Sequence, residues 1–210
     1  MTQHAALGSF IGARRSVRRY RSSPLERALI ERLLVAARQA PSAHNRQPWR
    51  FAVIEEHRTR AALASAMGER LRRDRTTDGD DPALIEADIA RSHARLSDAP
   101  AVIVVCLDMN DMDRYPDDRR SRAEYLMAVQ STAMAAQNLL LAAELEGLGA
   151  CVMCAPLFCP DSVIDVLALP DRWEPQMLVT VGAPAGPRRD RPRRPLSDIA
   201  VWRPAGQPAR

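Results

Sequence analysis

The chain has 210 residues, of which 46% are hydrophobic and 27% are charged. This length and composition are typical of a globular protein with one substantial core, so we expect a single domain over residues 1–210. We find neither an apolar run long enough to cross a bilayer nor a basic start followed by an apolar stretch, and we therefore expect a cytoplasmic protein without a membrane partner.

All thirty basic residues are arginine, and the formal net charge is +4. Without lysine, the chain cannot use a lysine Schiff base or a P-loop lysine. A basic balance is typical of nucleic-acid binding, but 26 acidic residues are interspersed, and the aromatic residues that would stack on bases make up only 4% of the chain. We therefore expect no nucleic-acid partner.

The first quarter of the chain is predicted to run from helix to turn to strand. Residues 1–13 indicate an arm or a short helix. Leucines at helical spacing predict a helix over 24–39 with Ser23 as its cap. Pro41 ends this helix because the residue before a proline is pushed away from the helical conformation. After a polar turn, residues 49–54 are predicted to form a strand.

The middle of the chain is predicted to hold two helices, a buried strand and a long helix. The helices are expected over 57–75 and 82–96. The valine-rich run 101–107 predicts a central strand that is buried on both faces. Residues 123–146 give the strongest helical pattern, and they are apolar almost all round, which predicts burial on several sides. Gly147 is the expected C-terminal glycine of this helix.

The last third is predicted to alternate between strands and a short helix. We expect strands over 150–155 and 176–181, and a helix over 160–169 between them. Beyond Gly182 the sequence is rich in proline and arginine, a composition that is also typical of disordered tails.

The four cysteines are Cys106, Cys151, Cys154 and Cys159. The C-x-x-C spacing of Cys151 and Cys154 occurs in redox motifs and in half of a zinc site, but no second ligand pair follows at zinc-site spacing. In a strand, the two side chains would point to opposite faces. We therefore expect buried, reduced cysteines with a structural role, and no metal site.

Two arginine-rich segments stand far apart in the chain: residues 14–20, R-R-S-V-R-R-Y, and residues 188–195, R-R-D-R-P-R-R-P. The planar guanidinium fork matches the geometry of phosphate oxygens, and a serine hydroxyl adds another donor. The two segments could therefore grip one phosphorylated ligand. The alternative is a basic surface exposed to solvent.

A second polar motif occupies residues 41–49, P-S-A-H-N-R-Q-P-W. Taken alone, serine and asparagine beside prolines are typical of turns, where they bond to their own backbone. With the segment R-R-S-x-R before it, however, the pattern P-S-x-x-N-x-Q-P-W resembles the nitroreductase superfamily of FMN enzymes. Both the order and the separation of the two motifs match that family.

Further similarity extends over most of the chain, in residues 115–117, 135–140, 147–149 and 173–175. These segments are most similar to the flavin domain that is fused to the glutamate ligase of deazaflavin-coenzyme biosynthesis. No ligase domain is present in this sequence. The resemblance implies an α+β fold, a three-layer sandwich with a mostly antiparallel sheet flanked by helices, and a long central helix at the interface of a homodimer.

The resemblance also implies roles for individual residues. Positive charge from Arg18 near the flavin N1 and O2 edge would make reduction easier. His44 is expected on the substrate side, and no residue is assigned to catalysis. The segment near N5 departs from the family pattern, because Pro156 removes a backbone donor there. The cofactor contacts implied are Arg14, Arg15, Ser16, Val17, Arg18, Ser42, Asn45, Gln47, Met153, Cys154, Arg193 and Arg194, of which Arg14, Arg15, Ser16, Arg193 and Arg194 would serve phosphate or ribityl.

The function implied is transfer of hydride from NAD(P)H through FMN to a small organic acceptor, a nitroaromatic or a quinone, in a ping-pong cycle. No glycine-rich dinucleotide fingerprint is present, so the nicotinamide would stack directly on the flavin. Two alternatives remain: a reductase of the dehydro precursor of the deazaflavin coenzyme, and a non-catalytic flavin-binding or storage protein. The paired motifs disfavour a helical structural protein without a cofactor.

Overall fold

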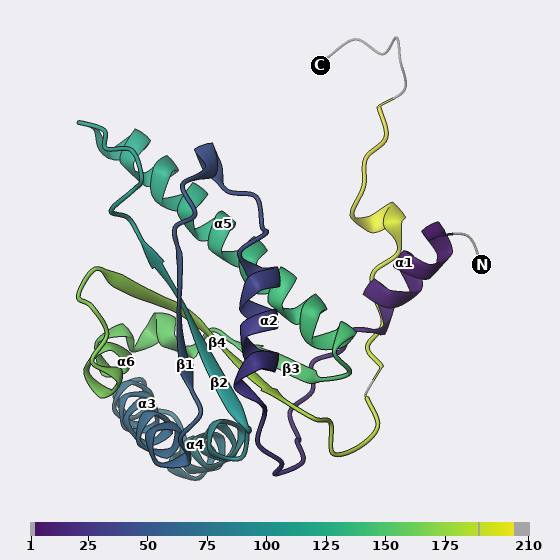
Figure 1. The fold of residues 1–210 in the computed structure, drawn as a ribbon. Helices are drawn as coiled ribbons and strands as arrows, with labels where there is room; N and C mark the ends of the chain where they lie inside the picture. The colour runs from purple at the N-terminus through teal and green to yellow at the C-terminus, as the bar shows by residue number, and fades with distance from the viewer. Residues whose placement is uncertain (1–2, 189, 204–210) are drawn as a thin grey trace.

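The structure, a computed structural model, describes residues 3–188 and 190–203 (Figure 1). Arg189 of the second arginine-rich segment lies outside the described residues. The main helices are α1 (Gln3–Ala13), α2 (Arg27–Ala37), α3 (His57–Thr77), α4 (Pro82–Ser97), α5 (Asp118–Leu145) and α6 (Pro160–Leu167). The strands are β1 (Trp49–Ile54), β2 (Ala101–Asp108), β3 (Gly149–Met153) and β4 (Trp173–Gly182), and the short 3-10 helices are η1 (Ala43–Asn45), η2 (Ala155–Phe158) and η3 (Leu196–Asp198).

The four strands form one antiparallel sheet in the order β1-β2-β4-β3. Every residue of β2 is buried, as the valine-rich run predicted. The pairing of β2 with β4 shifts between Val105 and Cys106, opposite Pro175. Such an irregularity lets a proline, which has no N–H, lie within a strand. Strand β4 therefore begins at Trp173, three residues before the predicted start.

Helices cover both faces of the sheet, as Figure 1 shows. Alternate residues of β2 enter two separate cores, because successive side chains of a strand point to opposite faces. Ile103 and Val105 pack with α2 and α5, whereas Val102 and Val104 pack with α3, α4 and α6. The α+β three-layer sandwich with a long central helix is thus confirmed.

Helix α5 runs for 28 residues along one face of the sheet. It begins five residues earlier than predicted, because the Asp117 side chain caps it by accepting a bond from the Arg120 amide. Gly147 follows the helix with a φ of 72°, as expected for a C-terminal glycine. Among the described residues, α5 is the one helix that is long and apolar enough to span a bilayer, contrary to the sequence expectation. The helix packs against α2 and the sheet as part of the core, which explains its apolar character.

The bounds of α2 and α6 also differ from the sequence expectation. Helix α2 begins at Arg27 after Glu26, which makes no side-chain cap, so Ser23 is not the cap. The amide of Arg21 donates to Ala183 O, which holds the preceding segment beside the end of β4 and delays the helix. Helix α6 ends at Leu167, where the left-handed Ala168 stops it earlier than predicted.

Candidate functional site

The first arginine-rich segment lies along the edge strand β3. The amide of Val17 donates to Ala150 O at 3.0 Å, and Ser16 forms a parallel bridge with the same residue. A Cβ atom on Gly149 would lie 2.5 Å from Val17 Cβ, so only glycine permits this approach. Val17 is buried, while Ser16 and Arg18 are exposed. The arginine-rich segment thus presents polar donors to solvent on a fixed backbone.

Tyr20 links the end of this segment to the interior strand β4 by hydrogen bonds. Its hydroxyl donates to Val17 O at 2.5 Å and lies 2.8 Å from the Thr180 hydroxyl. Burial raises the pKa of Tyr20, so the phenol stays protonated and keeps these bonds. Tyr20 was quoted in the motif but not assigned a role from the sequence.

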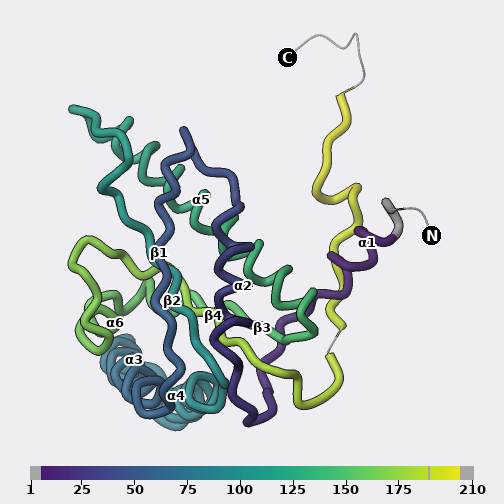
Figure 2. The backbone as a smooth tube through the Cα atoms, viewed as in Figure 1, coloured from purple at the N-terminus to yellow at the C-terminus, as the bar shows by residue number. Residues whose placement is uncertain are grey.

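The second arginine-rich segment meets the first one. Arg15 Nη2 lies 2.6 Å from Asp190 Oδ1, and Arg188 pairs with Glu144 near the end of α5. The hydrogen bond from Arg15 lowers the pKa of Asp190, aided by the amide of Arg191. In Figure 2, the tail runs beside α1, away from the sheet. The Arg15 guanidinium is therefore already arranged to hold an oxyanion.

The remaining members of the arginine group differ in their surroundings. Burial raises the pKa of Cys151, and the positive charges of Arg18, Arg95 and Arg14 oppose this rise. Arg193 and Arg194 are exposed a few residues beyond Asp190, and Arg193 Nη1 donates to Arg191 O at 3.1 Å. The two segments therefore meet at Arg15 and Asp190, whereas the described hydrogen bonds and ion pairs of Arg193 and Arg194 do not reach residues 14–18.

The second motif folds into a strained loop around η1. His44, Asn45 and Gln47 have φ values of 48°, 53° and 50°. The left-handed conformation costs about 1–2 kcal/mol for an L-residue, less for asparagine, and such strain concentrates at functional loops. Ser42 Oγ accepts a bond from the Gln47 amide at 3.0 Å, and Gln47 Nε2 donates to Asn45 Oδ1 at 3.3 Å. Except for the half-buried Ser42, these side chains are exposed.

The two motifs lie at different places along α5. The amide of Ala43 reaches Ser131 Oγ at 3.4 Å, whereas the arginine tail contacts Glu144. At 1.5 Å per residue, these helix positions are about 20 Å apart. Figure 1 shows the η1 loop and the segment that precedes α2 at separate ends of the molecule. One chain therefore does not bring the two halves of the expected site together.

Met153 and Cys154 lie at the end of β3 and just beyond it. Met153 is half-buried in the core, whereas Cys154 is exposed, so the expected burial is wrong for this cysteine. The reason is that β3 ends at Met153 and the chain turns into η2. Cys106, Cys151 and Cys159 are buried free thiols, and burial raises the pKa of Cys106 to about 12. In the described part of the chain, no three His, Cys, Asp or Glu side chains gather as they would around a metal ion.

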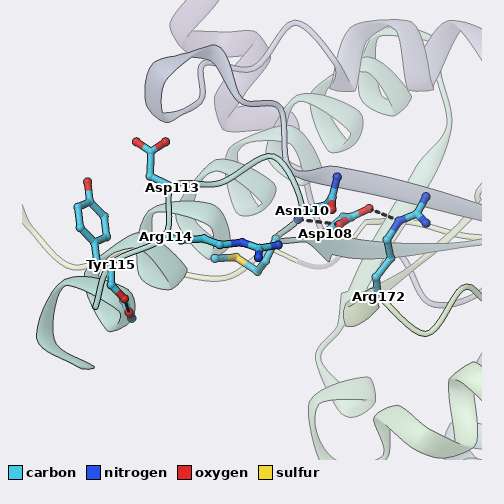
Figure 3. A pocket seen from close by; sticks show the side chains of 8 residues that line it. Asp108, Asn110, Asp113, Arg114, Tyr115 and Arg172 are labelled. Carbon is cyan, nitrogen blue, oxygen red and sulfur yellow. Dashed lines mark hydrogen bonds and ion pairs between the residues drawn. The ribbon is translucent and has the colours of Figure 1, made fainter. Parts of the chain in front are cut away.

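A buried carboxylate that sequence reasoning missed lies at the end of β2. Asp108 is 1% exposed and pairs with Arg172 Nε at 2.9 Å and Arg50 Nε at 3.5 Å. It borders a hollow of about 560 Å³, shown in Figure 3 with Arg114 and Arg172 on its wall. A second hollow, of about 680 Å³, lies beside Gln47 and Arg50. One feature of the sequence could have indicated this carboxylate: Asp108 is the acidic last residue of an otherwise apolar strand.

Comparison with known proteins identifies the family. Residues 11–183 match the model of the Nitroreductase family. The chain belongs to this family. It is 30% identical to the NADH dehydrogenase of Thermus thermophilus over 90% of this chain and 92% of that protein.

Solved structures agree with the family assignment. A Desulfovibrio desulfuricans protein described as a nitroreductase, solved in complex with FMN, matches this nitroreductase-family chain with a TM-score of 0.71 and 25% identity, covering 94% of this chain and 96% of that one. A Clostridium acetobutylicum protein described as an NADH oxidase matches with a TM-score of 0.69 and 28% identity, covering 92% and 99%. The nitroreductase-family chain is thus an oxidoreductase by its family, and the Thermus thermophilus and Clostridium acetobutylicum proteins are named for NADH chemistry.

Proposed function

We propose that this protein is an FMN-dependent oxidoreductase that passes hydride from NAD(P)H to a small organic acceptor, such as a nitroaromatic or a quinone. The observation that carries the proposal is the meeting of the two arginine-rich segments, where Arg15 already holds the carboxylate of Asp190. Its support from relatives is the FMN bound to the Desulfovibrio desulfuricans protein and the NADH activity in the name of the Thermus thermophilus protein.

The residues present fit the phosphate end of FMN. Arg15 binds one oxygen of Asp190 through both Nε and Nη2, and a phosphate oxygen can take the same place. Ser16 and Arg18 are exposed beside it on a backbone that is locked to β3. Bound FMN would supply the hydride-transfer chemistry, while the chain binds and orients it.

The other predicted contacts are proposed to bind the remaining parts of the cofactor. Arg18 would place positive charge at the pyrimidine edge, and the loop with Ser42, Asn45 and Gln47 would offer donors on the other side. His44 would face the substrate. The remaining proposed contacts are Arg14, Val17, Met153, Cys154, Arg193 and Arg194.

We propose that a homodimer completes the site. The face of α5 turned away from the sheet exposes Met134, at 39%, and Leu126, at 45%. If two copies pair this face antiparallel about a point midway between Ser131 and Glu144, the η1 loop of each meets the arginine segment of the other. Such a pairing covers the exposed apolar side chains and removes the separation of about 20 Å, which follows from the helical rise.

Reconstitution of the purified protein tests this proposal. FMN and riboflavin are titrated separately and followed by flavin fluorescence, while light scattering gives the mass of the protein in solution. We expect FMN to bind more tightly than riboflavin, because only FMN carries the phosphate, and we expect a dimer. Equal affinity for the two flavins would contradict the phosphate assignment, and no flavin binding would contradict the function. Bound flavin that NAD(P)H does not reduce would favour a storage protein or a deazaflavin-linked reductase.

A further inference from the structure

Asp108 is a charged side chain at the end of the most buried strand of the sheet. A carboxylate can remain in such a place only if its charge and its lone pairs are satisfied. Oδ1 accepts a bond from the Asn110 amide at 2.9 Å, and Oδ2 lies 2.9 Å from Arg172 Nε and 3.5 Å from Arg50 Nε. Figure 3 shows the bonds to Asn110 and Arg172.

Three consecutive carbonyl groups at the end of the η1 loop accept bonds from Asp108 or from its partner Arg50. The Asp108 amide donates to Pro48 O at 2.8 Å. Arg50 lies between the carboxylates of Asp108, 3.5 Å from its Nε, and Asp111, 3.4 Å from its Nη2. Through Nη1 it donates to Gln47 O at 3.0 Å and to Trp49 O at 2.9 Å. The backbone of Asp108 therefore holds the carbonyl of residue 48, and its arginine partner holds those of residues 47 and 49.

The strained backbone of this loop needs such a restraint. Gln47 keeps a left-handed backbone between the bond that its amide donates to Ser42 Oγ and the bond that its carbonyl accepts from Arg50. Strained conformations persist only where the surrounding structure over-determines them. Releasing the Arg50 side would let the backbone of Gln47, and with it Asn45, relax away from the observed arrangement.

We propose that Asp108 is a positioning residue of the flavin site, which acts through Arg50 to fix the loop of residues 42–47. This inference rests on the proposed function, because it takes the flavin as the ligand of that loop. It goes beyond it by assigning the loop geometry to a buried carboxylate that touches neither cofactor nor substrate.

The test compares Asp108→Asn with Arg172→Gln. The first change keeps the shape of the side chain but removes the buried one of the two carboxylate charges beside Arg50, the other being that of the exposed Asp111. The second removes the other arginine from the same carboxylate and leaves the link to the loop intact. Two readouts are measured: hydrogen exchange of the peptide covering residues 42–49 in the flavin-free protein, and the FMN dissociation constant together with the visible circular dichroism of the bound flavin.

We expect Asp108→Asn to speed exchange in the loop, to alter the flavin dichroism and to weaken FMN binding about tenfold, the loss that corresponds to one charge-assisted hydrogen bond. Arg172→Gln should leave exchange and dichroism as in the wild type and change affinity less than about twofold, since it does not act on the loop. Arg50→Gln should reproduce the effects of Asp108→Asn. It also serves as the test if Asp108→Asn does not fold, since Arg50 is a partly exposed residue.

Combining Asp108→Asn with Arg50→Gln should weaken FMN binding no further than either change alone, because both act through one path. Unchanged loop exchange in both single variants would overturn the inference, as would equal effects of Arg172→Gln and Asp108→Asn, which would reveal a general structural role. A wild-type protein that binds no FMN would overturn the proposed function instead, and the exchange data would still decide whether Asp108 holds the loop.

Discussion

The close approach of the first arginine-rich segment to the strand β3 makes Gly149→Ala the most informative substitution. The added Cβ would lie 2.5 Å from Val17 Cβ, and an ordinary contact begins at 3.4 Å, so the segment must move by about 0.9 Å. The bond from the Val17 amide to Ala150 O, now 3.0 Å, would then lie beyond hydrogen-bond distance.

The expected cost follows from these two effects. Overpacking in a close contact costs about 1–3 kcal/mol, and loss of one backbone hydrogen bond adds about 1 kcal/mol. We therefore expect the free energy of unfolding to fall by about 2–4 kcal/mol. FMN affinity should fall at least about tenfold, because Ser16 and Arg18 move with the displaced segment.

Urea denaturation of the flavin-free protein and fluorescence titration with FMN measure the two quantities. The matched control is Gly186→Ala, because a Cβ there meets nothing within 4 Å. The control should change neither quantity appreciably. If Gly149→Ala bound FMN as the wild type does and lost less than about 0.5 kcal/mol of stability, the segment would not depend on this contact and the reasoning would be refuted.

Four further results are expected. Arg18→Ala should weaken FMN binding about tenfold while circular dichroism shows an intact fold; wild-type flavin content would contradict the assignment. Asp190→Asn should strengthen FMN binding up to about threefold, because it frees Arg15, and should leave riboflavin binding unchanged; weaker FMN binding would oppose this. Met134→Arg should give a monomer by light scattering that no longer retains FMN, and a persistent dimer would place the interface elsewhere.

The fourth result concerns pH. Burial raises the pKa of Asp108, but the Asn110 amide, Arg172 and Arg50 together hold it below the ordinary 3.8, so its stabilisation is complete above 3.8 and is lost as the pH falls through its lower folded value. Urea unfolding should show a steeper acid decline for the wild type than for Asp108→Asn, and parallel curves would contradict this.

Much of the fold could be predicted from local patterns. The valine-rich run gave β2 within one residue, because burial on both faces leaves a continuous apolar signature. Boundaries failed where distant contacts decide them. Helix α2 starts late because Arg21 is held on Ala183, and β4 starts early because an irregular pairing accommodates Pro175. Neither contact has a local signature.

The candidate site could likewise be predicted only in part. Its two motifs were visible because phosphate binding and tight turns need particular residue types at short spacing. The network around Asp108 was not visible, because it depends on the strand order. Trp49 pairs with Leu107 and Trp173 pairs with Asp108, and only this register brings Arg50 and Arg172 to one carboxylate.

Anaerobic titration of the FMN-reconstituted protein with NADH and NADPH, followed by visible absorption, tests the central claim most directly. The account predicts that the flavin bands bleach with one equivalent of at least one nicotinamide, and that they return when a quinone or a nitroaromatic compound is added. Bound flavin that stays oxidised with both nicotinamides would contradict the claim that this protein is an NAD(P)H-dependent flavin oxidoreductase.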